Sequence, residues 1–138
     1  MRNDDVPNLD PAALARAEAA LAALADTYLA WADADAARLA AGLEQALCDP
    51  AGLHAHLPRL FRIAHDIKGQ AATFGYPLVG DLAHRLCHVL QACTADDPDP
   101  VDADRIAALV GAVVRAISLR LAGDGGEAGR KLLASLPE

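Results

Sequence analysis

The chain has 138 residues, of which 54% are hydrophobic but only 4% aromatic, and its net charge is −7 at pH 7. This length suits one domain whose core needs no metal or disulfide to hold it. The negative charge argues against nucleic acid, whose phosphates would be repelled. We expect no membrane segment and no signal peptide, and three cysteines without metal-type spacing suggest a reduced, cytoplasmic protein.

Residues 1–9 are polar and contain a proline, which predicts a flexible N-terminal tail and a single domain over residues 10–138. Asp10 and Pro11 form a typical helix start, a capping carboxylate followed by a proline where no N–H is needed. The next proline is Pro50, so residues 10–48 are expected to form one long helix, or two that meet near residues 26–27 or 33–35.

Apolar residues recur at helical spacing along this first segment. We expect Tyr28 and Trp31 to pack in the core or to cover its N-terminal end. The apolar positions are Leu14, Leu21, Leu24, Tyr28, Trp31, Leu39, Leu43 and Leu47.

A break at residues 49–52 separates this segment from a short turn at residues 53–57, and Pro58 opens a helix that ends at Gly75. His54 and His56 fall in the short turn and are expected to be loop residues. At roughly 100° per residue, one side of the helix after Pro58 is apolar and is predicted to be its buried stripe. The members of this stripe are Leu60, Ile63, Ile67, Gln70 and Phe74.

His65 points away from that stripe and is predicted to be displayed on the surface. Its neighbours on the same face are Arg62, Lys68, Gly69 and Ala72, which combine positive charge with small side chains. A core histidine would lie among the leucines instead. The surface around His65 is therefore open to a partner, and Pro58 and Phe61 at its edge offer apolar contact.

Three more helical segments follow, at about residues 77–93, 100–121 and 127–136, with an acidic, proline-containing loop over residues 94–100. The sequence shows no internal repeat and no strand pattern. We therefore predict an all-α fold, an antiparallel four-helix bundle with an extra N-terminal helix portion and a possible short C-terminal helix.

The pattern His65-x-x-Lys68-Gly69, with Gly75 six residues later, resembles the histidine-containing phosphotransfer (HPt) domain of two-component phosphorelays. The likeness continues through residues 73–76 and 82–87 and is greatest to the phosphotransfer module of chemotaxis-type kinases. The resemblance implies that His65 is the phosphorylated residue and that Lys68 supports it electrostatically. It further implies that Gly69 leaves clearance for a partner and that Gly75 closes the turn between two helices.

The resemblance also implies that the chain is a phosphocarrier without catalysis of its own. An imidazole is largely neutral at physiological pH and forms a labile phosphoramidate, so phosphate can leave again. A receiver domain of a response regulator or hybrid histidine kinase would contribute the aspartate and the Mg²⁺. We expect a monomer with no ATP site and no cofactor that passes phosphate between such receivers.

His84 is expected to lie at about the same height as His65 across the turn at Gly75. In chemotaxis-type modules a histidine here and a glutamate one turn later form hydrogen bonds with the phosphorylated histidine. The matching position in this chain is Cys87, and a weak thiol donor cannot orient an imidazole as a carboxylate does. This departure argues against phosphorylation by an ATP-using chemotaxis kinase and favours exchange with a receiver aspartate.

Two alternatives remain open at this point. The chain could be the substrate of a histidine kinase, acting as a phosphate sink. It could also belong to a different class, a metal-binding or scaffold bundle, because Asp81, His84 and His88 share one side of a helix. A solvated polar face explains those three residues more simply, and we predict no metal site.

Overall fold

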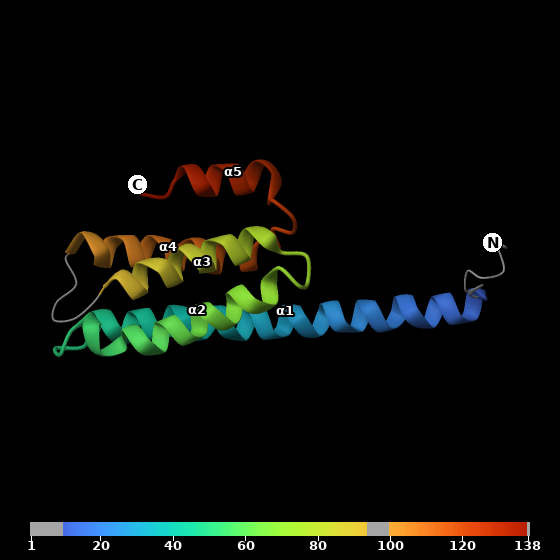
Figure 1. The fold of residues 1–138 in the computed structure, drawn as a ribbon, viewed down its shortest axis with the longest axis horizontal. Coiled ribbons are helices and arrows are strands. Elements are labelled where there is room, and N and C mark those ends of the chain that lie inside the picture. The colour runs from blue at the N-terminus through green and yellow to red at the C-terminus, as the bar shows by residue number, and fades with distance from the viewer. Residues whose placement is uncertain (1–9, 94–99, 138) are drawn as a thin grey trace, which may run out of the picture.

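The computed structural model describes residues 10–93 and 100–137, and over these ranges it contains helices and no strand (Figure 1). The all-α prediction is confirmed. The predicted tail at residues 1–9, and residues 94–99 of the predicted acidic loop, lie outside the described residues. The elements are α1 (Pro11–Cys48), the 3₁₀ helix η2 (Leu53–His56), α2 (Leu57–Ala71), α3 (Pro77–Ala92), α4 (Pro100–Ser118) and α5 (Gly126–Ala134).

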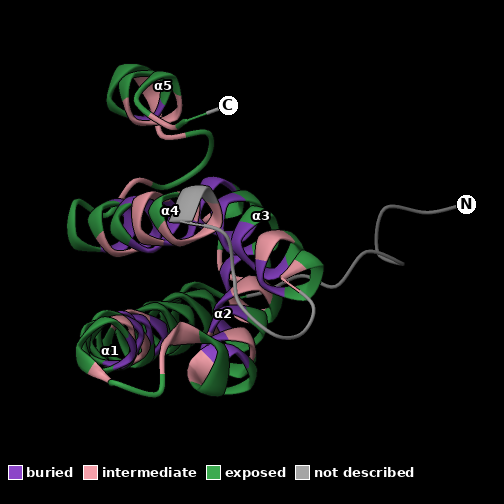
Figure 2. Ribbon diagram, turned by 90° about the vertical axis from the view of Figure 1, so that its left-hand side faces the viewer, coloured by how far each residue is buried: buried purple, intermediate pink, exposed green. Residues whose placement is uncertain are grey.

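Helices α1 to α4 form a closed ring in which each packs on its two neighbours: α1 on α2 and α4, and α3 on α2 and α4. Successive helices run in opposite directions, and α5 lies outside the ring against α4 (Figure 1). The buried residues of the four helices face one another around a single core (Figure 2). None of the described helices is long and apolar enough to cross a membrane.

The first helix is continuous, which decides between the one-helix and two-helix alternatives. Asp10 caps it as predicted, since its Oδ1 accepts a hydrogen bond from the Ala13 N–H at 2.6 Å. No proline interrupts the 38 residues that follow, and Gly42 has a packing role. A Cβ at that position would lie 3.1 Å from Leu60, so the glycine allows α1 and α2 to approach closely.

Small residues hold α2 and α3 close together. Ala64 and Ala71 on α2, and Ala83 on α3, are completely buried, and Gly80 is buried beside them. A Cβ added at Gly80 would stand 3.8 Å from the Ala71 side chain, in ordinary contact with α2. The hairpin of α2 and α3 shares the most extensive contact of any helix pair in the bundle.

The predicted buried stripe of α2 is only partly correct. Leu60 and Ile67 are buried, but Ile63, Gln70 and Phe74 are only half-buried. Because α2 is covered by both α1 and α3, its buried arc is centred about 60° further round the helix than the large residues suggest. The buried set is Leu57, Leu60, Ala64, Ile67 and Ala71.

The N-terminal part of α1 also differs from the prediction. Leu21 and Leu24 are 66% and 53% exposed, and Trp31 is 51% exposed, so the tryptophan is not a core residue. For the two leucines the cause is length, because α1 continues beyond the end of the bundle and no other described helix accompanies it there (Figure 1). Trp31 lies alongside α2, where it lines a surface pocket with Asp66 and Gln70. The first residue of α1 that is buried in the core is Tyr28.

Tyr28 closes the core at the end where α1 leaves it. Its ring stacks on Phe74 at a centroid distance of 4.8 Å and lies 5.3 Å from the ring of Tyr76. Beside it, Arg120 in the turn after α4 donates two hydrogen bonds to the Asp33 carboxylate of α1, at 2.6 and 2.9 Å. These contacts join the turn after α2 and the end of α4 to the first helix.

Burial, with a smaller contribution from Tyr76, raises the pKa of Tyr28 to about 12. The neutral phenol is thus favoured in the folded state, and its stabilising contribution is complete below the ordinary tyrosine pKa of about 10. We expect the free energy of unfolding to fall as pH rises from about 10 to about 12. Urea unfolding across that interval measures this.

The Tyr28→Phe variant is the control, because it keeps the stacked ring and removes the ionisable group. It should lack the late-titrating phenolate in ultraviolet absorbance and should show a weaker alkaline loss of stability. An unchanged titration curve in the variant would contradict the assignment of the raised pKa to Tyr28.

Candidate functional site

His65 is exposed in the middle of α2, as predicted. It follows the buried Ala64, so it lies about 120° from the centre of the buried arc rather than directly opposite it. That rotation turns the imidazole toward the α3 side of the helix, where it lines a groove with α3 residues. The ring of Phe61, one turn earlier, lies 5.8 Å from the His65 ring at 32°.

A groove of about 710 Å³ runs between α2 and α3, with His65 in its wall. It brings together five of the residues singled out from the sequence on α2, and three on α3. The α2 residues are Pro58, Phe61, Arg62, His65 and Lys68, and the α3 residues are His84, Cys87 and His88. Sequence reasoning did not identify Leu57, Leu90 and Cys93, which also line it.

Lys68 is half-buried and lines the groove, one turn beyond His65. It shares the side of α2 that carries His65 but is less exposed than the histidine. Its positive charge acts on Cys87, whose thiol is buried in α3. Burial raises the pKa of the Cys87 thiol and the Lys68 ammonium opposes that rise. The groove thus contains the Lys68 cation one turn from His65 and the neutral Cys87 thiol on α3.

His84 is exposed and lies in the same groove as His65, which agrees with their expected similar height. Within the described ranges, however, the ring of His65 has no hydrogen bond to His84, Cys87 or any other side chain. The groove therefore positions His65 by helix packing and by its contact with Phe61. The predicted support by His84 stays a prediction.

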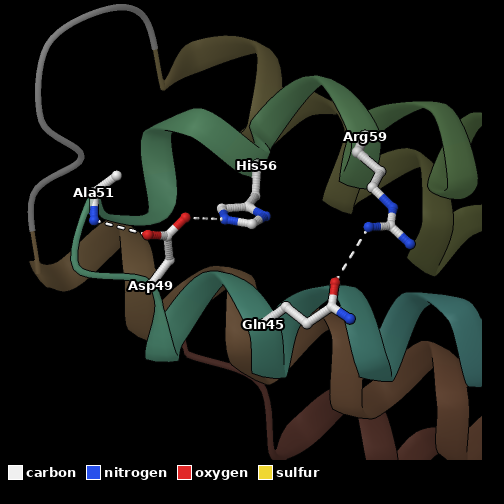
Figure 3. Close-up of polar contacts among 5 residues, drawn as sticks. All are labelled: Gln45, Asp49, Ala51, His56 and Arg59. Carbon is white, nitrogen blue, oxygen red and sulfur yellow. Dashed lines mark hydrogen bonds and ion pairs between the residues drawn. The ribbon is translucent and has the colours of Figure 1, made fainter.

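The N-terminal end of α2 is fixed by a polar cluster in the connection from α1 (Figure 3). The Asp49 carboxylate hydrogen-bonds to His56 Nε2 at 2.7 Å and accepts from the Ala51 N–H at 2.8 Å. The bond to His56, then that to Ala51, lowers the pKa of Asp49. Arg59 donates to Gln45 Oε1 at 3.2 Å. His56, expected to be a simple loop residue, therefore anchors the helix that carries His65.

The coordination alternative lacks a ligand cluster in the part of the chain that the structure describes. Among the described residues, no group of three or more His, Cys, Asp or Glu side chains is arranged to hold a metal ion. His84 and His88 line the groove, whereas Asp81 does not.

A family model described as "Hpt domain" matches residues 23–116, which cover most of α1 and all of α2 and α3. The chain belongs to the Hpt domain family. Hpt domains are histidine phosphotransfer modules of two-component phosphorelays, and the resemblance read from His65, Lys68 and Gly69 is confirmed at this level. Among the curated proteins and the solved structures, no match was found.

The Hpt match contains the whole groove and leaves out both ends of the chain. Residues 11–22 of α1 and the helix α5 lie outside the matched range. The matched range thus contains most of the four-helix ring.

Gly69 and Ala72 keep the surface of the Hpt domain next to His65 free of bulky side chains. Both are exposed, and a Cβ added at Gly69 would meet no atom within 4 Å. Gly75 adopts a φ of 88° in the turn after α2, a conformation that favours glycine. That turn is tied to the loop before α5, since the Gly123 N–H donates to the Gly75 carbonyl at 3.0 Å.

We expect Gly69→Phe to leave the Hpt fold intact, because the new side chain enters open space on a helix. Glycine is a poor helix residue, so the free energy of unfolding should change by less than about 1 kcal/mol. Thermal unfolding followed by circular dichroism measures this. Gly111→Phe on α4 is the matched control, since that exposed helical glycine also has no atom within 4 Å of an added Cβ.

Proposed function

We propose that His65 accepts a phosphoryl group from the aspartyl phosphate of a receiver domain and passes it to another receiver. The single observation that carries this proposal is the exposed imidazole in a groove beside Lys68, on a chain of the Hpt family. The partners would be receiver domains of response regulators or hybrid histidine kinases, in the cytoplasm. Residues 10–138 would act together as the phosphotransfer unit.

In the forward step a ring nitrogen of His65 attacks the phosphorus of the aspartyl phosphate. The N–P bond forms as the P–O bond to the aspartate breaks, the aspartate leaves as a carboxylate, and the imidazole releases its proton to solvent. The reverse sequence returns the phosphoryl group to another aspartate. The receiver would provide the Mg²⁺ that neutralises phosphate charge, and Lys68 would add a positive charge from this side.

The surface that meets the receiver would be the α2 side of the groove. Pro58 and Phe61, which precede His65 on α2, provide apolar contact, and Arg62 provides positive charge. Gly69 and Ala72, both exposed and small, allow the partner's active site to reach His65.

Direct phosphorylation by a histidine kinase, with this chain as a phosphate sink, is the alternative within the family. Cys87 disfavours it, because the buried neutral thiol offers no carboxylate to orient His65 or to take its proton. A receiver that brings its own metal and aspartate needs less from the phosphocarrier.

Incubation with a phosphorylated receiver should give the chain a label that is labile in acid and stable in base, as expected for phosphohistidine. The His65→Gln variant should take no label, while His88→Gln on the opposite side of the groove should be labelled normally. Label that persists in His65→Gln would move the phosphorylation to another residue and overturn the proposal.

Lys68→Ala should slow transfer by about tenfold or more, because the charge beside the phosphoryl group is lost, and tenfold corresponds to about 1.4 kcal/mol. Gly69→Phe should block transfer by holding the receiver away, whereas Gly111→Phe should not. Single-turnover transfer rates at several receiver concentrations separate the two effects. An equal loss in both phenylalanine variants would contradict the proposed docking surface.

A further inference from the structure

The segment of α1 that projects from the bundle, residues 11–27, is called the arm. Its apolar side chains are uncovered, with Leu14, Leu21 and Leu24 at 46%, 66% and 53% exposure. They fall on one stripe with Ala17, at spacings of three and four residues. The charged residues Arg16, Glu18 and Asp26 lie about 80° or more from the centre of that stripe.

The stripe on the arm continues the face that α1 buries inside the bundle. Tyr28, Ala32 and Leu39 carry the same face onward beneath α2 and α4. Because that face is covered everywhere beyond residue 27, its exposure on the arm indicates a missing partner helix. Large apolar side chains grouped in this way mark an interaction site rather than scattered surface residues.

We propose that a second copy of this chain covers the arm, through antiparallel pairing of the two arms. In the register that places residue 11 level with residue 27 of the other copy, Leu14 lies opposite Leu24 and Ala17 opposite Leu21. Each contact then occurs twice, as a two-fold symmetric interface requires, and a small residue always faces a large one at the centre.

The bundle itself selects this orientation and this register. Phe74 and Tyr76 cover Tyr28 and so block the stripe at the root of the arm. In an antiparallel pair the partner's α1 begins at this point, so the two helices can pair along the full arm. A parallel partner would bring two such turns together at the same place, and the helices would have to separate.

The expected affinity follows from the area. The arm is about 25 Å long, so two facing strips about 10 Å wide cover roughly 500 Å² in total. Stable interfaces usually bury about 1,200–2,000 Å². The dimer should therefore be weak and depend on concentration. A weak dimer of this kind would replace the monomer expected from the sequence only at high protein concentration.

Sedimentation equilibrium of the full chain over a range from micromolar to several hundred micromolar tests the proposal. The average mass should rise from 14.3 kDa toward twice that value. Leu21→Glu should raise the dissociation constant at least tenfold, because each dimer would bury two unpaired charges. Ala19→Glu adds the same charge on the opposite side of the arm and should change little.

X-ray scattering of the dimer tests the orientation. Since α1 has 38 residues and is about 57 Å long, antiparallel arms give a particle about 90 Å long, whereas parallel arms give one near 60 Å. Circular dichroism below the dimerisation range should show equal helicity in both variants. Phosphate acceptance by His65 should be the same in Leu21→Glu as in the unmodified chain, so this test is independent of the proposed function.

Three results would overturn the proposal. A mass that stays at 14.3 kDa throughout the range would leave the arm to a different partner. A dimer that survives Leu21→Glu, or that Ala19→Glu weakens equally, would place the interface elsewhere. A dimer near 60 Å in length would reject the antiparallel arrangement.

Discussion

The close contact between α2 and α3 is the constraint on which the site depends. Alanine and glycine at the contact let the two backbones approach, and Gly80 lies against the carbonyl of Lys68 and the side chain of Ala71. Larger residues there would move α3 outward and widen the groove that holds His65 and His84. The position of the exposed His65 imidazole therefore depends on the small residues at the contact between α2 and α3.

The groove combines a rigid support with few polar constraints on the reactive ring. Asp49 and His56 fix the start of α2, and the hydrogen bond between Gly123 and Gly75 holds the turn that follows it. Between these two points the His65 ring lies beside the Phe61 ring and has no hydrogen-bond partner among the described residues. Such a ring is positioned by its helix and remains free to meet an incoming group.

Much of the helical structure and the exposure of His65 could be predicted from the sequence, because helix signals are local. The Asp10 cap, the break at residues 49–52 and the exposure of His65 depend on neighbouring residues alone. The buried arc of α2 could not be predicted, since alanine gives no contrast in an alanine-rich chain and Ala64 and Ala71 owe their burial to α1 and α3.

The first helix shows the other limit of sequence reasoning. A stripe of leucines indicates that something covers a helix, but its periodicity is the same whether the cover lies in the same chain or in another. Only the length of α1 relative to its neighbours distinguishes the residues within the bundle, such as Leu39, from the leucines of the arm. That comparison needs three-dimensional structure.

The four helices of the ring have different roles. The groove belongs to α2 and α3, whereas α1 packs on α2 and α4 along faces turned away from it. Substitutions on the outer sides of α1 and α4 can therefore accumulate during evolution without altering what a signalling partner encounters. A gene encoding this chain could acquire new assembly behaviour through its first helix while its place in a signalling circuit is preserved.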